Sequence, residues 1–118
     1  ETALSDKDFI KKIKEVFGVK AVKHTNSKSN LVQRVALCGG SGSELLPNAI
    51  KSNSDAFVTS DISYHRFFDA KKVIFLADIG HWESEQYTIQ LITDYIRSKM
   101  TNFAVIKTES LTNPITTS

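Results

Sequence analysis

The residues best suited to chemistry in this sequence are an imidazole and a carboxylate, His81 and Glu85, that stand four positions apart. They follow an apolar run, 73–77, and begin the longest amphipathic segment of the chain. At helical spacing both side chains project from one side of the first turn. A carboxylate that points toward a sheet needs a partner, because an unpaired buried charge is costly. A metal ion is one such partner, and neutral imidazole beside carboxylate is a common ligand combination.

The helix that begins at this pair is predicted to run to about Met100, with an apolar stripe facing the sheet. The stripe continues the line of His81 and Glu85 and consists of Ile89, Ile92 and Ile96. From spacing alone a simpler interpretation is favoured, in which His81 caps the turn and Glu85 complements the helix dipole. Two ligands also hold a divalent ion poorly, since zinc sites normally use at least three.

Strands alternate with helices after residue 30, which predicts an α/β fold: a three-layer domain with a mixed sheet covered by helices. The predicted strands are 19–24, 31–38, 55–59, 73–77 and 103–107. The predicted helices are 6–17, 43–51, 62–70 and 81–100. A capping box at Ser5 and Asp8 begins the first helix, and Gly18 ends it. Its predicted buried face is Phe9, Ile10, Ile13, Val16 and Phe17. Residues 1–118 are expected to form one domain, with 111–118 as a tail.

Three strand-to-helix junctions carry polar side chains: 38–43, 59–65 and 78–85. In an open α/β sheet such junctions lie at the carboxyl ends of the strands, where ligands usually bind. The side chains that could supplement the first pair there are Asp61, His65 and Asp78. Asp61 is interpreted as a helix N-cap, and His65 as a surface residue or a second-layer partner of the metal ligands.

A glycine-rich turn at the first junction could expose backbone amides to a phosphate. It consists of Gly39, Gly40, Ser41 and Gly42. The turn lacks the endings of a P-loop and of the dinucleotide fingerprint, so a tight structural turn is the favoured interpretation. Cys38 is interpreted as a small buried apolar residue rather than a nucleophile, because no histidine partner is evident. Tyr64 and Trp82 near the junctions are interpreted as packing residues.

Composition fits an ordinary globular protein, with 41% hydrophobic and 24% charged residues among 118. The net charge of +2 gives no indication of binding to nucleic acid or an anionic membrane. No apolar run reaches the ~20 residues of a membrane span, and no signal peptide is visible. The single cysteine is typical of a reducing compartment, which predicts a cytoplasmic protein. The start without methionine, close to a helix, predicts a piece of a longer chain.

Four ordered segments carry a resemblance to a known family. They are Val35–Gly42, Asp55–Asp61, Asp69–Ala70 and Gly80–Glu85, and the ending Thr112–Pro114 also fits. Each segment is weak alone, whereas the ordered set is fairly specific and spans Ser5 to Ile115. The chain resembles the C-terminal half of the Ngg-interacting-factor-three-like family, often named GTP cyclohydrolase of type two. Ser60 is a departure, because many relatives have glycine before the acid.

The resemblance implies a dinuclear metal site between two related α/β halves. The family motif Gly-His-x-x-x-Glu falls on His81 and Glu85 as metal ligands, with Asp61 and His65 as supporting groups. The other ligands, a histidine pair and an aspartate, belong to the N-terminal half, and this chain has no His-His pair. The site would be incomplete here, and zinc, iron and manganese all suit it. Family members are described as hexameric rings, so the implied partners are the missing half and further copies.

The resemblance therefore implies that the chain is the C-terminal lobe of a dinuclear-metal-dependent hydrolase. The expected substrate is a nucleotide or a phosphate-containing small molecule. The chain alone is expected to bind metal weakly and to have no turnover. The alternative is a non-catalytic metal-binding or protein-interaction and assembly module, in which sheet edges and helices make the contacts.

Overall fold

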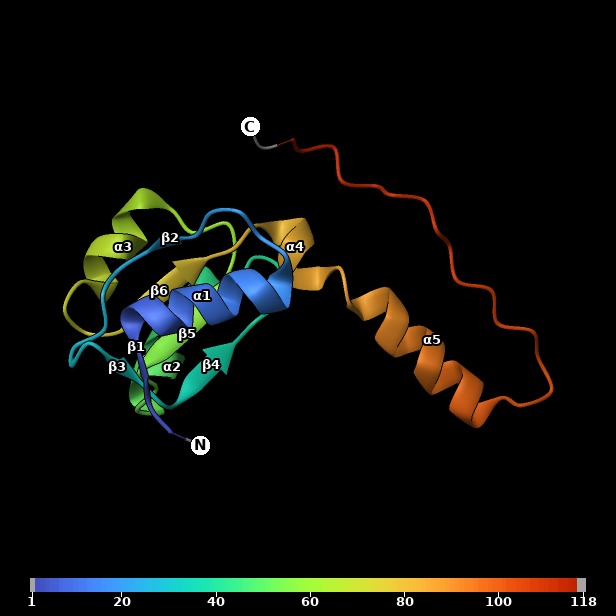
Figure 1. Cartoon of the computed structure of the whole chain (residues 1–118), viewed down its shortest axis with the longest axis horizontal. Coiled ribbons are helices and arrows are strands. Elements are labelled where there is room, and N and C mark those ends of the chain that lie inside the picture. Colours follow the sequence, from blue (N-terminus) through green and yellow to red (C-terminus); the bar gives the residue numbers. More distant parts are fainter. Residues whose placement is uncertain (1, 117–118) are drawn as a thin grey trace. The chain divides into compact units, whose positions relative to one another are not determined.

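A four-stranded mixed sheet in the order β2-β6-β5-β4 lies at the centre of the first part of the chain (Figure 1). Its strands are β2 (Lys23–His24), β4 (Val35–Leu37), β5 (Ala56–Thr59) and β6 (Phe75–Asp78). β4, β5 and β6 are parallel to one another, and β2 pairs with β6 in the antiparallel direction. The predicted α/β fold with a mixed sheet is therefore confirmed.

The computed structural model describes residues 2–116. Their contacts divide the chain into two compact units, Glu1–Ser84 and Glu85–Ser118. The first unit holds the four-stranded sheet. It also holds a small antiparallel pair formed by β1 (Leu4–Ser5) and β3 (Leu31–Val32).

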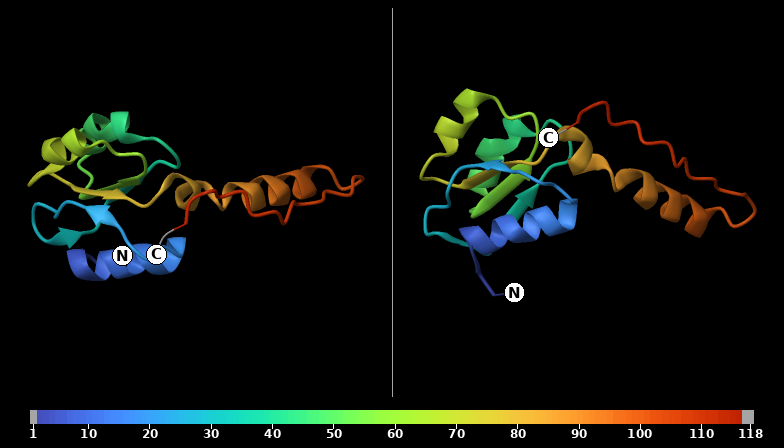
Figure 2. Two further views of the ribbon diagram at one scale, coloured as in Figure 1. Left: turned by 90° about the horizontal axis from the view of Figure 1, so that it is seen from above. Right: turned by 45° about the horizontal axis from the view of Figure 1, so that its top comes forward.

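Helix α1 (Asp6–Phe17) covers one face of the four-stranded sheet (Figure 2). Phe9 and Ile13 are buried there against alternate residues of the central strands, Val58 among them. The Phe9 ring meets Phe75 edge to face, with centroids 5.3 Å apart. Burying each such side chain contributes about 1.5–3 kcal/mol, so the aromatic pair is a main attachment of α1.

Both predicted ends of α1 are confirmed. The Ser5 hydroxyl accepts a hydrogen bond from the Asp8 amide at 3.1 Å, and Gly18 ends the helix with φ 67°, a conformation that favours glycine. The predicted buried face was wrong at Val16, which is exposed. Ile10 and Phe17 are partly buried and pack against the core.

The opposite face of the sheet is covered by α2 (Leu46–Lys51) and α3 (Tyr64–Ala70), with a short 3-10 turn, η1 (Ser43–Leu45), before α2. Phe57 and Leu76 point to this side, since side chains alternate along a strand. The three predicted layers, helix, sheet and helices, are thus present in the first unit (Figure 2).

The predicted strand 31–38 is in fact two strands, and one carboxylate explains the interruption. Oδ2 of Asp55 accepts hydrogen bonds from the backbone amides of Gln33, at 3.0 Å, and Arg34, at 2.8 Å. These amides are thereby bound by a side chain instead of a neighbouring strand, so β3 ends before them and β4 begins after them.

The predicted helix 81–100 is also two helices, α4 (His81–Glu85) and α5 (Thr88–Lys99). The break falls at Gln86–Tyr87, ahead of Thr88 and Ile89, and tyrosine, threonine and isoleucine all have modest helix propensity. The predicted burial of the stripe was wrong, because Ile89 and Ile92 are each about half exposed.

The predicted strand 103–107 was wrong too, since these residues form no regular element. Side-chain hydrogen bonds tie this segment to α5 instead: Arg97 Nη2 donates to the Val105 carbonyl at 3.0 Å, and Lys107 Nζ donates to Gln90 Oε1 at 2.8 Å. Residues 111–116 form no regular element, and the last two positions of the predicted tail, 117–118, lie outside the described residues. No helix between residues 2 and 116 is both long and apolar enough to cross a bilayer.

One threonine joins the chain after β2 to β6. The Thr25 hydroxyl donates to the Ile74 carbonyl at 2.7 Å and accepts from the Leu76 amide at 2.9 Å. The Thr25 amide also donates to the Leu76 carbonyl at 3.0 Å. The hydroxyl thus takes the place that a backbone carbonyl would have in a regular ladder.

We predict that Thr25→Val lowers the free energy of unfolding by about 1–3 kcal/mol, because the buried amide of Leu76 and carbonyl of Ile74 lose their partner. Urea unfolding monitored by circular dichroism measures the change. The matched control is Thr101→Val at an exposed position, expected within about 0.5 kcal/mol of the parent. Equal effects of the two substitutions would contradict the assigned role of Thr25.

Candidate metal centre

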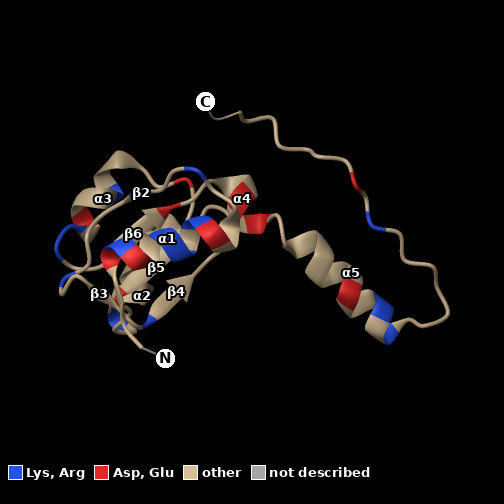
Figure 3. Ribbon diagram, in the orientation of Figure 1, with Lys and Arg blue, Asp and Glu red and all other residues tan. Residues whose placement is uncertain are grey.

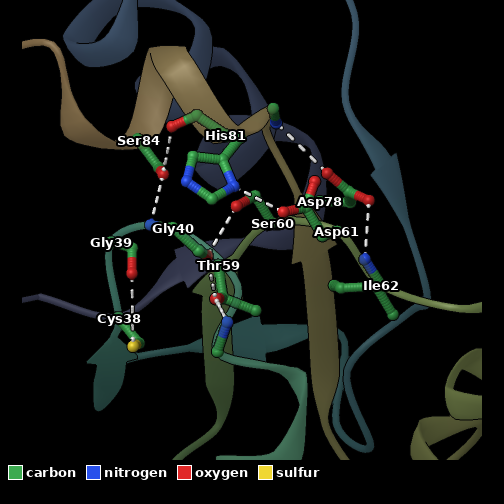
Figure 4. Close-up of polar contacts among 12 residues, drawn as sticks. Cys38, Gly39, Gly40, Thr59, Ser60, Asp61, Ile62, Asp78, His81 and Ser84 are labelled. Carbon is green, nitrogen blue, oxygen red and sulfur yellow. Dashed lines mark hydrogen bonds and ion pairs between the residues drawn. The ribbon is translucent and has the colours of Figure 1, made fainter.

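The three polar junctions meet at one edge of the sheet (Figure 4). Because β4, β5 and β6 are parallel, their carboxyl ends lie side by side, and the segment after each strand begins there. The shared location predicted from the sequence is confirmed. Hydrogen bonds of Gly40 with Thr59, Ser60 and Ser84 join all three junctions.

The carbonyl of Gly40 is the centre of this network. It accepts hydrogen bonds from the Ser60 amide at 3.1 Å, the Thr59 hydroxyl at 3.0 Å and the Ser60 hydroxyl at 2.5 Å. The Gly40 amide donates to the Ser84 hydroxyl at 2.7 Å, which links the first junction to the third. Thr59 and Ser60 are fully buried. Their hydroxyls therefore depend on Gly40, because a buried hydroxyl without a partner is costly.

The glycine-rich turn, for which a structural role was favoured over an anion site, makes internal hydrogen bonds through two of its amides. Gly40 binds Ser84, as above, and the Gly42 amide donates to the Thr59 hydroxyl at 3.0 Å. A Cβ at Gly42 would lie 2.5 Å from that hydroxyl oxygen and 2.7 Å from the Cys38 sulfur, so only glycine fits. Cys38 is a free thiol, half-buried against the α2–α3 side of the core, in line with its predicted packing role. The Gly40 and Gly42 amides are therefore occupied within the protein and would not bind an anion at this turn.

Asp78, the last residue of β6, organises two of the junctions. Its Oδ2 accepts from the Ile62 amide and its Oδ1 from the Gly80 amide, both at 3.1 Å. Gly80 has φ 90°, a conformation that favours glycine, and it directly precedes α4. Asp78 thereby fixes the loop that leads to α3 and the turn that presents His81.

The central feature of the site is a contact between Asp61 and His81, which are twenty positions apart in sequence. Oδ2 of Asp61 lies 2.5 Å from Nδ1 of His81, and both side chains are about half exposed. Asp61 has φ 54°, in the left-handed region that aspartate enters more readily than most residues.

The predicted helix-capping role of Asp61 was wrong. α3 begins at Tyr64, its N-cap is Ser63, and Asp61 precedes it in an irregular loop. Asp61 and His65 therefore do not share a helical face. His65 is exposed on α3, where its ring contacts Tyr64. Ser60, the departure from the family pattern, is buried with its hydroxyl on Gly40 and so helps to define the turn before Asp61.

Glu85 is the last residue of α4, which carries His81 at its start. It is exposed, and the second compact unit begins with it. Among residues 2–116 no group of three or more His, Cys, Asp or Glu side chains is placed to hold a metal ion. The described residues do not form a complete metal centre. What they provide is an imidazole oriented by a carboxylate, the arrangement found around metal-binding histidines.

Known proteins of similar sequence and structure have the same fold as this chain. A GTP cyclohydrolase 1 type 2 homolog of Lactococcus lactis is 34% identical over 107 residues, which cover 87% of this chain and 41% of that protein. Staphylococcus aureus protein SA1388 has a similar crystal structure, with TM-score 0.82 and 25% identity over the whole chain and 40% of its own length. A Bacillus cereus protein related to NIF3 has the same fold, with TM-score 0.79 and 22% identity.

The chain spans about a third to two fifths of the length of these relatives. Residues 1–114 match the family described as Duf34/NIF3 (NGG1p interacting factor 3). Fold, junction geometry and sequence therefore agree, and the chain belongs to the Duf34/NIF3 family.

Proposed function

We propose that this chain is one lobe of a metal-dependent hydrolase whose dinuclear centre is completed by residues outside it. The Asp61–His81 contact at the carboxyl edge of the sheet carries the proposal. A carboxylate on Nδ1 fixes the orientation of the imidazole and raises its basicity as a ligand. The ligating atom of His81 would then be Nε2, and Glu85 on the same helix would add a carboxylate oxygen.

The remaining ligands would come from the part of the protein that the relatives possess and this chain does not cover, about three fifths of their length. That is why His81 and Glu85 alone do not form a site. Zinc, iron and manganese all accept mixed imidazole and carboxylate ligation. In a dinuclear centre the metals supply electrostatic stabilisation and an activated water.

For the substrate we propose a nucleotide or another small molecule that contains phosphate. Relatives named GTP cyclohydrolase 1 type 2 homolog support this class. In this chain the Gly39 and Ser41 amides at the same sheet edge are the groups that would meet an anion. We further propose that the whole protein is cytoplasmic, where the free thiol of Cys38 is stable, and is a homo-oligomer, a hexamer by family resemblance.

A second candidate is a non-catalytic module for metal binding or protein assembly. It is favoured by the exposed apolar side chains of α5, among them Leu91 at 71% and Tyr95 at 64% exposure, which could contact a partner. The two candidates differ in the whole protein: a hydrolase needs stoichiometric metal at His81, whereas an assembly module keeps its partners when that metal is lost.

We predict that the whole protein contains stoichiometric metal, and that His81→Ala or Glu85→Ala removes most of it. Elemental analysis after dialysis provides the measurement. This 118-residue chain should retain only substoichiometric metal and show no hydrolysis of nucleotides. Tight stoichiometric metal in the chain alone would contradict an incomplete site, and unchanged metal in both variants would favour the assembly module.

We predict that Asp61→Asn in the whole protein weakens metal binding by about 10- to 100-fold, because the amide orients His81 less well and removes the charge beside it. Competition with a chelator measures the affinity. Asp69→Asn is the matched control, since Asp69 is an exposed acid that pairs with Arg66 on α3. The metal affinity of the Asp69→Asn variant should stay within about twofold of that of the parent protein. A similar loss in both variants would argue against a specific role for Asp61.

A further inference from the structure

A groove of about 740 Å³ lies between the segment 23–27 and α3. Its volume falls in the range of ligand sites in proteins. The lining comprises Lys23, His24, Thr25, Asn26, Ser27, Tyr64, Phe67, Phe68, Lys71 and Lys72. None of these residues is among the proposed metal ligands or the groups that hold them, so the groove is a separate feature of the first unit.

The wall of the groove on α3 is aromatic and open to solvent. Tyr64 is 73% exposed and Phe68 is 56% exposed, and their rings meet edge to face with centroids 5.1 Å apart. Phe67 lies between them in sequence and packs against the core, which holds the wall in place. Tyr64 was expected from the sequence to be a packing residue, and its exposure corrects that expectation. Exposed apolar surface of this kind marks interaction sites.

The charge of the groove has one sign. Its lining includes Lys23 from β2 and Lys71 and Lys72 from the connection after α3, and it includes no Asp or Glu. The ribbon of that connection is blue in Figure 3, the colour of Lys and Arg. The acid of α3 near this connection, Asp69, already pairs with Arg66 at 3.5 Å. Three lysines without compensating acids in the lining favour a partner that carries negative charge.

The other border of the groove is an edge of the sheet. β2 stands at the end of the strand order and pairs only with β6 among the described strands. The Thr25 amide donates to Leu76 of β6. Because backbone groups alternate along an antiparallel strand, the amide and carbonyl of His24 point away from β6. A sheet edge next to a groove is the arrangement in which an extended peptide adds a strand.

We propose that this groove binds an extended acidic segment of a partner protein, with its main chain along β2 and an apolar side chain against Tyr64 and Phe68. Acidic side chains on the same segment would meet Lys23, Lys71 and Lys72. The alternation of a strand suits this pattern, since every second side chain faces the same way. The inference is independent of the proposed metal chemistry, because it uses other residues and does not require catalysis.

The test uses a short fluorescein-labelled peptide in which Glu alternates with Val around a central Phe. Fluorescence anisotropy measures its binding to this chain. We expect saturable binding that weakens as salt is raised. We expect Lys71→Glu combined with Lys72→Glu to weaken it by about tenfold or more. Lys11→Glu combined with Lys14→Glu makes the same charge change on exposed positions of α1 and should alter the affinity by about twofold or less.

The apolar contact is tested separately by Phe68→Ser, which should lower the affinity for the peptide by about fivefold or more. Its matched control is Phe103→Ser, a similarly exposed phenylalanine in the second unit, expected to leave the affinity unchanged. Amide chemical shifts of residues 23–27 should move on titration with the parent peptide.

Three results would overturn the proposal: equal weakening by both lysine pairs, binding without shifts at residues 23–27, or failure of the peptide to bind. If a nucleoside triphosphate binds to the groove while the peptide does not, the groove is a small-molecule site and the peptide proposal is wrong.

Discussion

The parallel alignment of β4, β5 and β6 is the constraint on which the site depends. It brings three junctions, far apart in sequence, to one edge of the sheet. The Gly40 carbonyl then ties the first junction to the second through Thr59 and Ser60, and the Gly40 amide ties it to Ser84 in the third. These bonds are buried or half-buried, where each lost partner is costly. The contact between Asp61 and His81 depends on this alignment, because it places the loop after β5 beside the start of α4.

Two aspartates at the strand ends have different tasks. Asp78 is occupied by backbone amides on both oxygens, which makes it a structural clamp for the loops around it. Asp61 is held in a left-handed conformation and directs a carboxylate oxygen at His81. The clamp fixes the two loops, and the second aspartate sets the orientation of the imidazole. Asp78 ends β6 and Asp61 lies two positions after the end of β5, yet only Asp61 takes part in the proposed metal chemistry.

The sequence predicted features that depend on local chemistry. The cap at Ser5, the stop at Gly18 and the alternation of strands and helices follow from side-chain types and spacing, and all are confirmed. Features that depend on distant residues were missed. The break between β3 and β4 comes from Asp55, about twenty positions later, and the Asp61–His81 contact spans the same distance. The exposure of Ile89 and Ile92 on α5 was also missed, because periodicity shows which residues share a face and not whether that face is covered.

The proposed metal centre requires that His81 is a metal ligand whose orientation is set by Asp61. Anomalous X-ray diffraction from crystals of the whole, metal-loaded protein tests this most directly. We expect a metal peak about 2.0–2.1 Å from Nε2 of His81, with Nδ1 still bound to Asp61 and a Glu85 oxygen in the coordination sphere. A metal held by other residues, with His81 outside its coordination sphere, would contradict it.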